Sequence, residues 1–312
     1  MRLKTLVSLL LLGASTLASA KEKIIFWHAM GGNFQPTLNK IVEEYNKSQD
    51  KIEVEALYQG SYQEALNKFK SVQGTDKAPA LIQLNEISTE YMYNSGAITP
   101  MQEFVKKDNY DLTKLEDTLI NYYTINGTLY SMPFNSSASI LLYNKDAFKE
   151  VGLDPEKAPT TWAELADYSV KLTNDHRKGV GIALNSGSAQ WGFTGFALQN
   201  STDGKNLMNE DGKKVYFNTP ENVEALQFWL DLQNKYKSMA SGIVQWTDLP
   251  TQFLAGEVAM IYHTTGNFAN IRDNAKFNYG VAFLPGNKRV AAPTSESPVF
   301  EREDWQPVSR VP

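Results

Sequence analysis

The amino-terminal part of the chain alternates between short apolar runs and segments whose apolar residues recur at helical spacing. Ile24–Trp27 is entirely apolar, as a buried strand requires, whereas residues 35–45 place apolar side chains on one face of a helix. Ser61 followed by Glu64 is a capping-box pattern, which predicts that a helix begins there. Because strands alternate with helices, we predict an α/β domain on a mainly parallel sheet. Its predicted elements are strand 24–27, helix 35–45, strand 52–57, helix 61–72 and strand 80–84.

A second domain is predicted to begin near Pro133. Before it, residues 86–93 have a helical pattern, and Asn126-Gly127 between two short segments is typical of a β-hairpin turn. Beyond it, Thr161 is the predicted N-cap of a helix with Glu164 three positions later. The other elements predicted there are strand 140–143, helix 145–151, helix 221–236, helix 249–255, strand 258–262 and strand 279–284.

The first twenty residues have the pattern of a secretory leader. Arg2 and Lys4 precede an apolar run at residues 6–12, and Ala18-Ser19-Ala20 is a small-residue cleavage site. The run is shorter than the roughly 20 apolar residues that cross a bilayer, so a cleaved leader is favoured over an anchor. We therefore expect a mature chain that begins near Lys21, is released into the periplasm and has no membrane anchor.

Composition limits the possible partners. The chain has no cysteine, so a disulfide, a thiolate nucleophile and a lipid-modified cysteine are all excluded. Without residues 1–20 it carries 28 basic against 35 acidic residues, a net charge of −7, which argues against nucleic acid and anionic lipid. A mature chain of about 290 residues exceeds the size at which a single core keeps growing, so two lobes are expected.

Signatures of catalysis are scarce in the sequence. His28, His176 and His263 lie far apart with no metal-ligand spacing, so neither a metal site nor a cofactor is predicted. No G-x-S-x-G, P-loop or G-x-G-x-x-G pattern follows a predicted strand. Aromatic and small polar residues instead gather in predicted loops after strands, where open α/β sheets bind ligands. These predicted ligand loops are residues 27–33, 58–62, 85–88 and 186–193.

Several strings in this sequence resemble the family-1 extracellular solute-binding proteins of ABC importers. The Tyr-Asn-Lys-Asp string at residues 143–146 is general to the family, whereas residues 25–30, 58–64 and 133–137 favour its glycerol-phosphate branch. The resemblance runs from about Ile24 to about Pro285. The strings that carry it are IFWHAM (25–30), YQGSYQE (58–64), APALIQ (78–83), PFNSS (133–137), YNKDAF (143–148), ANIR (269–272) and KFNYGV (276–281).

The resemblance implies a two-lobed α/β periplasmic-binding-protein fold of class II type, with hinge-linked lobes and a ligand held in the cleft between them. It places the amino-terminal lobe at residues 21–133 and the carboxy-terminal lobe at residues 134–284. The first hinge is expected at Met132, Pro133, Phe134 and Asn135. Residues 285–312 form an incomplete return segment and a tail that the family does not match, so the chain is expected to be truncated at its carboxyl end.

Carried over by position, the resemblance implies five ligand-binding residues: Tyr62, Glu86, Ser137, Trp191 and Thr264. Glu86 can accept hydrogen bonds from glycerol hydroxyls, and Trp191 offers a flat apolar face to the carbon backbone. The three hydroxyl groups are neutral donors for phosphate oxygens. Ser188 stands where the family has a further tryptophan, and the family's later ligand-binding arginine has no counterpart in this sequence.

The function expected from these observations is capture of sn-glycerol 3-phosphate for the membrane subunits of an ABC importer, by a monomer that is not an enzyme. Two alternatives stay open. The ligand could be an oligosaccharide or a glycerophosphodiester within the same family. An extracellular carbohydrate-active hydrolase is the alternative of another class, since a pair of carboxylates across a cleft leaves no mark in sequence.

Overall fold

The computed structural model describes residues 21–203, 207–209, 213–289, 291–292 and 300–301. The expected leader and most of the expected carboxy-terminal tail lie outside these residues. The chain divides into two compact units, Met1–Leu84 and Asn85–Pro312. The expected lobe boundary near Pro133 falls inside the second unit and stays a prediction.

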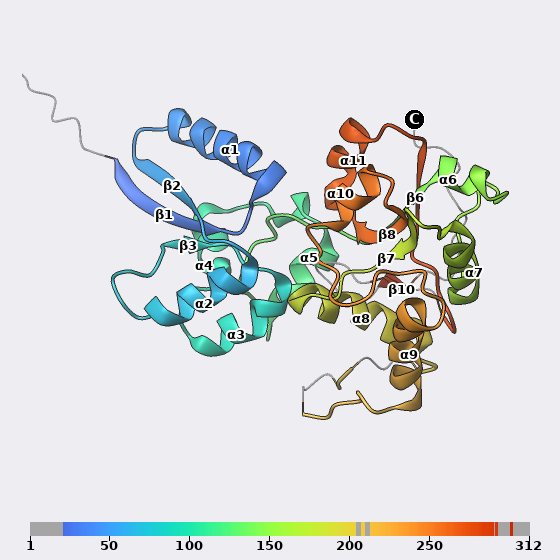
Figure 1. The fold of residues 1–312 in the computed structure, drawn as a ribbon. Helices are drawn as coiled ribbons and strands as arrows, with labels where there is room; N and C mark the ends of the chain where they lie inside the picture. The colour runs from blue at the N-terminus through green and yellow to red at the C-terminus, as the bar shows by residue number, and fades with distance from the viewer. Residues whose placement is uncertain (1–20, 204–206, 210–212, 290, 293–299, 302–312) are drawn as a thin grey trace, which may run out of the picture. The chain divides into compact units, whose positions relative to one another are not determined.

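The first unit is a three-stranded sheet in the order β2-β1-β3, with all neighbours parallel. Its buried apolar side chains come from β1, α1 and α2, and Figure 1 shows these helices beside the sheet. The predicted alternation of strands and helices is therefore confirmed. The elements are β1 Glu22–His28, η1 Gly32–Phe34, α1 Gln35–Ser48, β2 Ile52–Tyr58, α2 Tyr62–Val72 and β3 Leu81–Ile82.

The predicted capping box at the start of α2 is present. Ser61 Oγ accepts a hydrogen bond from the Glu64 backbone N–H at 3.3 Å, and the Glu64 carboxylate accepts one from the Ser61 backbone N–H at 2.7 Å. These bonds lower the pKa of Glu64. Two backbone donors that the helix itself cannot satisfy are thereby paired, which fixes the residue at which α2 begins.

The second unit contains a four-stranded sheet in the order β7-β8-β6-β9. Only β7 and β8 are parallel, and β6 is antiparallel to both of its neighbours. Its elements before residue 160 are η2 Glu86–Ser88, α3 Thr89–Ser95, α4 Met101–Asp108, η3 Leu112–Lys114, α5 Asp117–Tyr122, β4 Thr124–Ile125, β5 Thr128–Leu129, β6 Ser139–Asn144 and α6 Lys145–Glu150. Those that follow are α7 Trp162–Leu172, β7 Lys178–Gly181, α8 Ser186–Asn200, α9 Pro220–Asn234, α10 Leu249–Leu254, β8 Val258–Thr264, η4 Thr265–Asn267, α11 Phe268–Asn274, β9 Tyr279–Ala282, β10 Ala291–Ala292 and β11 Phe300–Glu301.

Strand β6 is buried along its whole length and separates two apolar clusters. Leu141 and Tyr143 belong to the cluster that includes side chains of α7, α8 and α9, whereas Ile140 and Leu142 belong to the cluster with α10 and α11. Because side chains alternate across a strand, one strand contributes to both clusters. Figure 1 shows helices on both sides of this sheet. The sequence has a continuous apolar run here for that reason.

Two turns in the second unit depend on glycine. The predicted hairpin is confirmed as β4–β5, where Asn126 has φ 51° and Gly127 has φ 75°, the left-handed conformation that this turn type requires. In β9, Gly280 lies opposite Tyr143 of β6, and a Cβ atom there would approach the phenol ring to 2.1 Å. A larger residue at position 280 would displace that ring.

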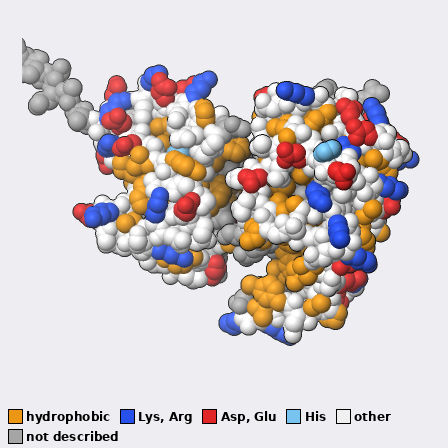
Figure 2. Space-filling model, viewed as in Figure 1, with side chains coloured by type: hydrophobic (Ala, Val, Ile, Leu, Met, Phe, Trp, Pro, Cys, Tyr) orange, Lys and Arg blue, Asp and Glu red, His pale blue; other side chains and the backbone are white. Residues whose placement is uncertain are grey.

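Helix α9 exposes apolar side chains on the face turned away from its buried residues. Val223, Leu226 and Leu230 are between 42% and 54% exposed, and Val215 and Phe217 of the preceding segment are more exposed still. Figure 2 shows a broad apolar area on the lower part of the second unit, where α9 lies. The helix was predicted from its apolar residues, but they do not form one stripe.

Candidate functional site

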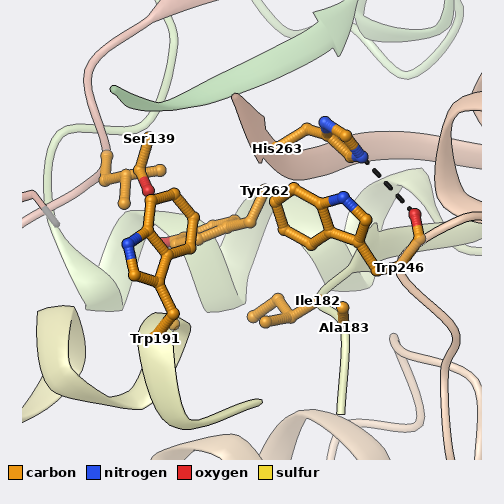
Figure 3. Close-up of a pocket in the computed structure, with 9 residues that line it drawn as sticks. Ser139, Ile182, Ala183, Trp191, Trp246, Tyr262 and His263 are labelled. Carbon is orange, nitrogen blue, oxygen red and sulfur yellow. Dashed lines mark hydrogen bonds between the residues drawn. The ribbon is translucent and has the colours of Figure 1, made fainter. Parts of the chain in front are cut away.

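A shallow hollow opens at one edge of the sheet in the second unit, and it encloses about 310 Å³, open space at its mouth included. Strands β7 and β8 are parallel, so both end at this edge, and β6 begins there because it runs the other way. The sheet topology thus gathers residues from distant parts of the chain. Figure 3 shows the hollow with its indole side chains. Its lining residues are Ser139, Ile182, Ala183, Trp191, Gly192, Trp246, Tyr262, His263 and Leu284.

Two tryptophans and a histidine form an aromatic row in the hollow (Figure 3). Trp191 of α8 and Trp246 meet edge to face, with ring centroids 5.8 Å apart and an interplanar angle of 85°. Trp246 in turn stacks on His263 of β8 at 4.0 Å and 30°. The Trp246 backbone N–H donates to Asn185 Oδ1 at 2.9 Å, which ties the indole to the residue that precedes α8. The row is therefore held from both of its ends.

His263 is buried and uncharged. Burial lowers its pKa to about 4, while a hydrogen bond to the Trp246 carbonyl opposes that effect in part. Nε2 lies 3.4 Å from this carbonyl, and the Asn267 side-chain amide donates to Nδ1 at 2.8 Å. The Asn267 oxygen accepts from Asn270, which fixes the orientation of its amide. Both imidazole nitrogens are therefore satisfied in the neutral tautomer with hydrogen on Nε2.

Tyr262 contributes a buried hydroxyl to the hollow. Its ring stacks on Phe196 of α8 at 5.3 Å and 18°. Within the described part of the chain, its hydroxyl has no hydrogen-bond partner, and burial raises its pKa well above the ordinary value. An unpaired hydroxyl in an apolar setting costs free energy unless another molecule satisfies it. Together with Ser139, it is the natural polar contact for a ligand in this hollow.

The hollow carries no net charge, because its lining consists of apolar, hydroxyl and neutral imidazole groups. Such a surface favours the C–H face of a polyol or sugar, with hydrogen bonds from the hydroxyl groups. It offers no cation that could pair with a phosphate. Among the described residues, no cluster of three or more His, Cys, Asp or Glu side chains could hold a metal ion, and no helix is long and apolar enough to cross a membrane.

Of the five predicted ligand residues, Trp191 lines the hollow, and Ser137 and Thr264 lie beside it. Thr264 ends β8 directly opposite Ser139, a lining residue. Ser137 comes two residues before Ser139 and is half-buried. The intervening Ala138 accepts a hydrogen bond from the backbone N–H of Thr265 at 3.0 Å and donates one to its hydroxyl at 3.2 Å. The structure therefore brings three of the five residues to one sheet edge.

The other two predicted residues begin helices elsewhere. Tyr62 is the first residue of α2 in the first unit, and its hydroxyl accepts a hydrogen bond from Gln83 Nε2 at 3.4 Å. Glu86 is the first residue of η2, and its backbone carbonyl accepts a hydrogen bond from the Tyr122 hydroxyl at 3.3 Å. Burial first, and the Glu86 charge second, raise the pKa of Tyr122 to about 12. The ligand-binding roles of Tyr62 and Glu86 stay predictions.

The expected hinge has an irregular backbone. Met132 and Pro133 are half-buried, Phe134 and Asn135 are exposed, and all four lie between β5 and β6 outside any helix or strand. One ligand-loop prediction was wrong: residues 186–193 are the first half of α8 rather than a loop. Serine and glycine lower helix propensity there, and the apolar residues of α8 show no single face, so the helical pattern is hidden.

A family model decides the classification. The model of bacterial extracellular solute-binding proteins matches residues 31–297, which is most of the chain. The chain belongs to this family. Its members' name and the relatives below indicate a periplasmic or extracellular location, and the two-lobed α/β fold predicted from the sequence is confirmed by solved relatives.

Relatives in other bacteria are sn-glycerol-3-phosphate-binding periplasmic proteins. That of Pectobacterium atrosepticum is 36% identical over 280 residues, which cover 86% of this chain and 61% of the relative. That of Escherichia coli strain 536 is 35% identical over 296 residues, covering 91% of this chain and 66% of the relative. The chain thus spans somewhat less than two thirds of the length of these relatives.

Two solved structures show the same fold. UgpB from Mycobacterium tuberculosis in complex with glycerophosphocholine has a TM-score of 0.78 and 23% identity, covering 88% of this chain and 68% of that one. An ABC transporter solute-binding protein from Thermotoga lettingae bound with α-D-tagatose has a TM-score of 0.77 and 25% identity, covering 88% and 71%.

Sequence reasoning missed four lining residues of this solute-binding protein. Trp246 lies in an irregular segment, and His263 was set aside because it has no metal-ligand spacing. Tyr262 and Ser139 were assigned to, or next to, buried strands. A signal was present: the apolar strand 258–262 runs directly into His263-Thr264-Thr265, and polar residues that end a parallel strand lie at a ligand-binding edge.

Proposed function

We propose that this chain is the substrate-binding component of an ABC importer, that it captures sn-glycerol 3-phosphate in the periplasm, and that it delivers this ligand to the membrane subunits as a monomer. Identity of 35–37% to sn-glycerol-3-phosphate-binding proteins over 86–91% of the chain carries the proposal. The family supplies the class, binding rather than catalysis. Cleavage of a leader after Ala20 would release the chain into that compartment.

The chemistry of the predicted residues supports this ligand. Trp191 presents an aromatic face for the three-carbon backbone. The hydroxyls of Tyr62, Ser137 and Thr264 can donate to phosphate oxygens, and Glu86 can accept from the free hydroxyls of glycerol. Hydroxyl donors bind an anion at short range even in an acidic protein, because salt screens the net charge over about 8–10 Å.

The uncharged hollow favours a second candidate ligand, a glycerophosphodiester or a sugar. Its indoles and neutral histidine suit a carbon-rich group and supply no cation for a phosphate monoester. A diester carries one negative charge fewer than a monoester at neutral pH, so it makes a smaller demand on positive charge. The two ligands therefore differ in what they require from this surface.

Calorimetric titration of the chain without residues 1–20 tests the proposal. We expect sn-glycerol 3-phosphate to bind saturably and Glu86→Gln to weaken it about tenfold or more, the equivalent of a lost hydrogen bond to a charged group. Glu103→Gln, an exposed carboxylate on α4, is the matched control and should leave binding unchanged. Tighter binding of glycerophosphocholine or of a maltose-type sugar than of sn-glycerol 3-phosphate would reject the first ligand in favour of the second.

A further inference from the structure

Gln83 is a buried amide at the end of the central strands of the first unit. Its side chain belongs to a residue that is 7% exposed. Its backbone N–H donates to the Trp27 carbonyl at 2.8 Å, which extends the pairing of β1 with β3 by one residue. The backbone at position 83 is therefore fixed by the sheet, and its side chain leaves from a defined point.

The contacts of Gln83 leave one orientation for its amide group. The backbone N–H of Ala29 points at Oε1, 3.0 Å away, and this N–H can only donate. The amide nitrogen must then occupy the other position, where it lies 3.2 Å from Met30 Sδ and 3.4 Å from the Tyr62 hydroxyl. Each of its two hydrogens faces one of these acceptors. The orientation follows from the chemistry of Ala29 rather than from the shape of the side chain.

This orientation decides how the Tyr62 hydroxyl can act. A phenol has one hydrogen and accepts through its oxygen. Because Gln83 presents hydrogens toward that oxygen, the hydrogen of Tyr62 must turn toward an acceptor outside this pair. A glutamate in place of Gln83 would reverse the polarity, since a carboxylate would accept the Tyr62 hydrogen for itself.

The surroundings of this pair carry no positive charge. His28 at the end of β1 is 1% exposed, and its Nδ1 accepts from the Met30 backbone N–H at 3.2 Å. Burial lowers the pKa of His28, so its imidazole is neutral at periplasmic pH. The nearest acid on α2, Glu64, is held by Ser61 at the helix start. A ligand acceptor at this edge is therefore met by neutral donors, whose orientation matters more than charge.

We propose that Gln83 is a positioning residue for ligand binding, which keeps Tyr62 as a hydrogen-bond donor and so selects a ligand group that accepts, such as a phosphate oxygen. The inference rests on the proposed function, because it assigns a partner to the Tyr62 hydroxyl. Gln83 need not touch the ligand to act in this way. It sets the direction of one hydrogen.

The test is a double-mutant cycle with Gln83→Glu and Tyr62→Phe, read by calorimetric titration with sn-glycerol 3-phosphate at pH 8 and pH 5. At pH 8 we expect Gln83→Glu to weaken binding about 10- to 100-fold, as for a lost hydrogen bond to a charged group. In the Tyr62→Phe background the same change should cost almost nothing further. At pH 5 the introduced carboxylate, whose pKa is raised by burial, regains a proton to donate, so affinity should recover.

Gln63→Glu, an exposed position beside Tyr62 on α2, adds the same charge and is the matched control. Thermal melts of each variant exclude unfolding as the cause of a loss. An equal loss in both Tyr62 backgrounds, or a loss that persists at pH 5, would overturn the positioning role while leaving the proposed function intact. Absence of binding by the unmodified chain would instead reject the proposed ligand, and the inference with it.

Discussion

Replacing Tyr262 by phenylalanine should make the chain more stable. The substitution removes only the hydroxyl, and the ring keeps its stacking on Phe196 at 5.3 Å. The hydroxyl is buried and has no partner among the described residues, and such a group costs about 1–3 kcal/mol. The small void left by one oxygen returns part of this gain, because contacts with that atom are lost. We expect the free energy of unfolding to rise by about 1 kcal/mol.

Tyr143→Phe is the matched control, since it makes the same chemical change in the same sheet. The Tyr143 hydroxyl donates to the Pro155 carbonyl at 3.2 Å, so its removal breaks a bond and should lower the free energy of unfolding by about 1 kcal/mol. Urea denaturation, with the slope compared between variants, measures both changes. If the two substitutions destabilise the chain equally, the Tyr262 hydroxyl has a partner and the reasoning is wrong.

The same variant also tests the hollow as a binding surface. If Tyr262→Phe stabilises the free chain and weakens ligand binding, the ligand is the missing partner of the hydroxyl. Stabilisation without any change in affinity would remove Tyr262 from the site and leave Ser139 as the polar group of the hollow. In either case the stability and the affinity are measured on one pair of proteins.

Three further predictions concern named side chains. The pKa of His263 is about 4 when folded and about 6.5 when exposed, so the unfolded chain takes up a proton first; stability should fall by about 2 kcal/mol from pH 7 to pH 5, and urea titrations of His263→Phe should lack this slope. Trp246→Ala uncovers that imidazole, and an NMR titration should find its pKa raised toward the ordinary value; an unchanged pKa would mean that other groups bury it. Ser61→Ala removes the N-cap of α2 and should cost about 1 kcal/mol by urea denaturation, whereas Ser71→Ala, late in the same helix, should cost less.

Local signals predicted the fold well where neighbouring residues carry the whole interaction. Ser61 and Glu64 pair across a single helical turn, so the sequence is enough to locate that helix start. At the start of α7 the prediction was right about Thr161 as the cap, but Glu164 bonds to the Thr160 N–H at 2.7 Å rather than to Thr161. The spacing of such pairs is legible in sequence, and the final choice of donor depends on backbone geometry.

The aromatic row of the hollow could not be predicted in the same way. Trp191, Trp246 and His263 come from a helix, an irregular segment and a strand, and only the parallel arrangement of β7 and β8 brings them together. The resemblance to solute-binding proteins located Trp191, whereas Trp246 and His263 required the structure. Long-range proximity of this kind depends on the order of strands in the sheet, which periodicity does not reveal.

The central position of β6 has a consequence for how the chain is made. Its partners β8 and β9 come more than a hundred residues later, with Ser139 opposite Thr264 and Asn144 opposite Tyr279. At a synthesis rate of about 5–20 residues per second, β6 waits several seconds or longer for its neighbours. Throughout that interval its apolar residues Ile140–Tyr143 have no sheet to join, and such segments aggregate readily. A chain built in this order needs a holding chaperone before it needs a ligand.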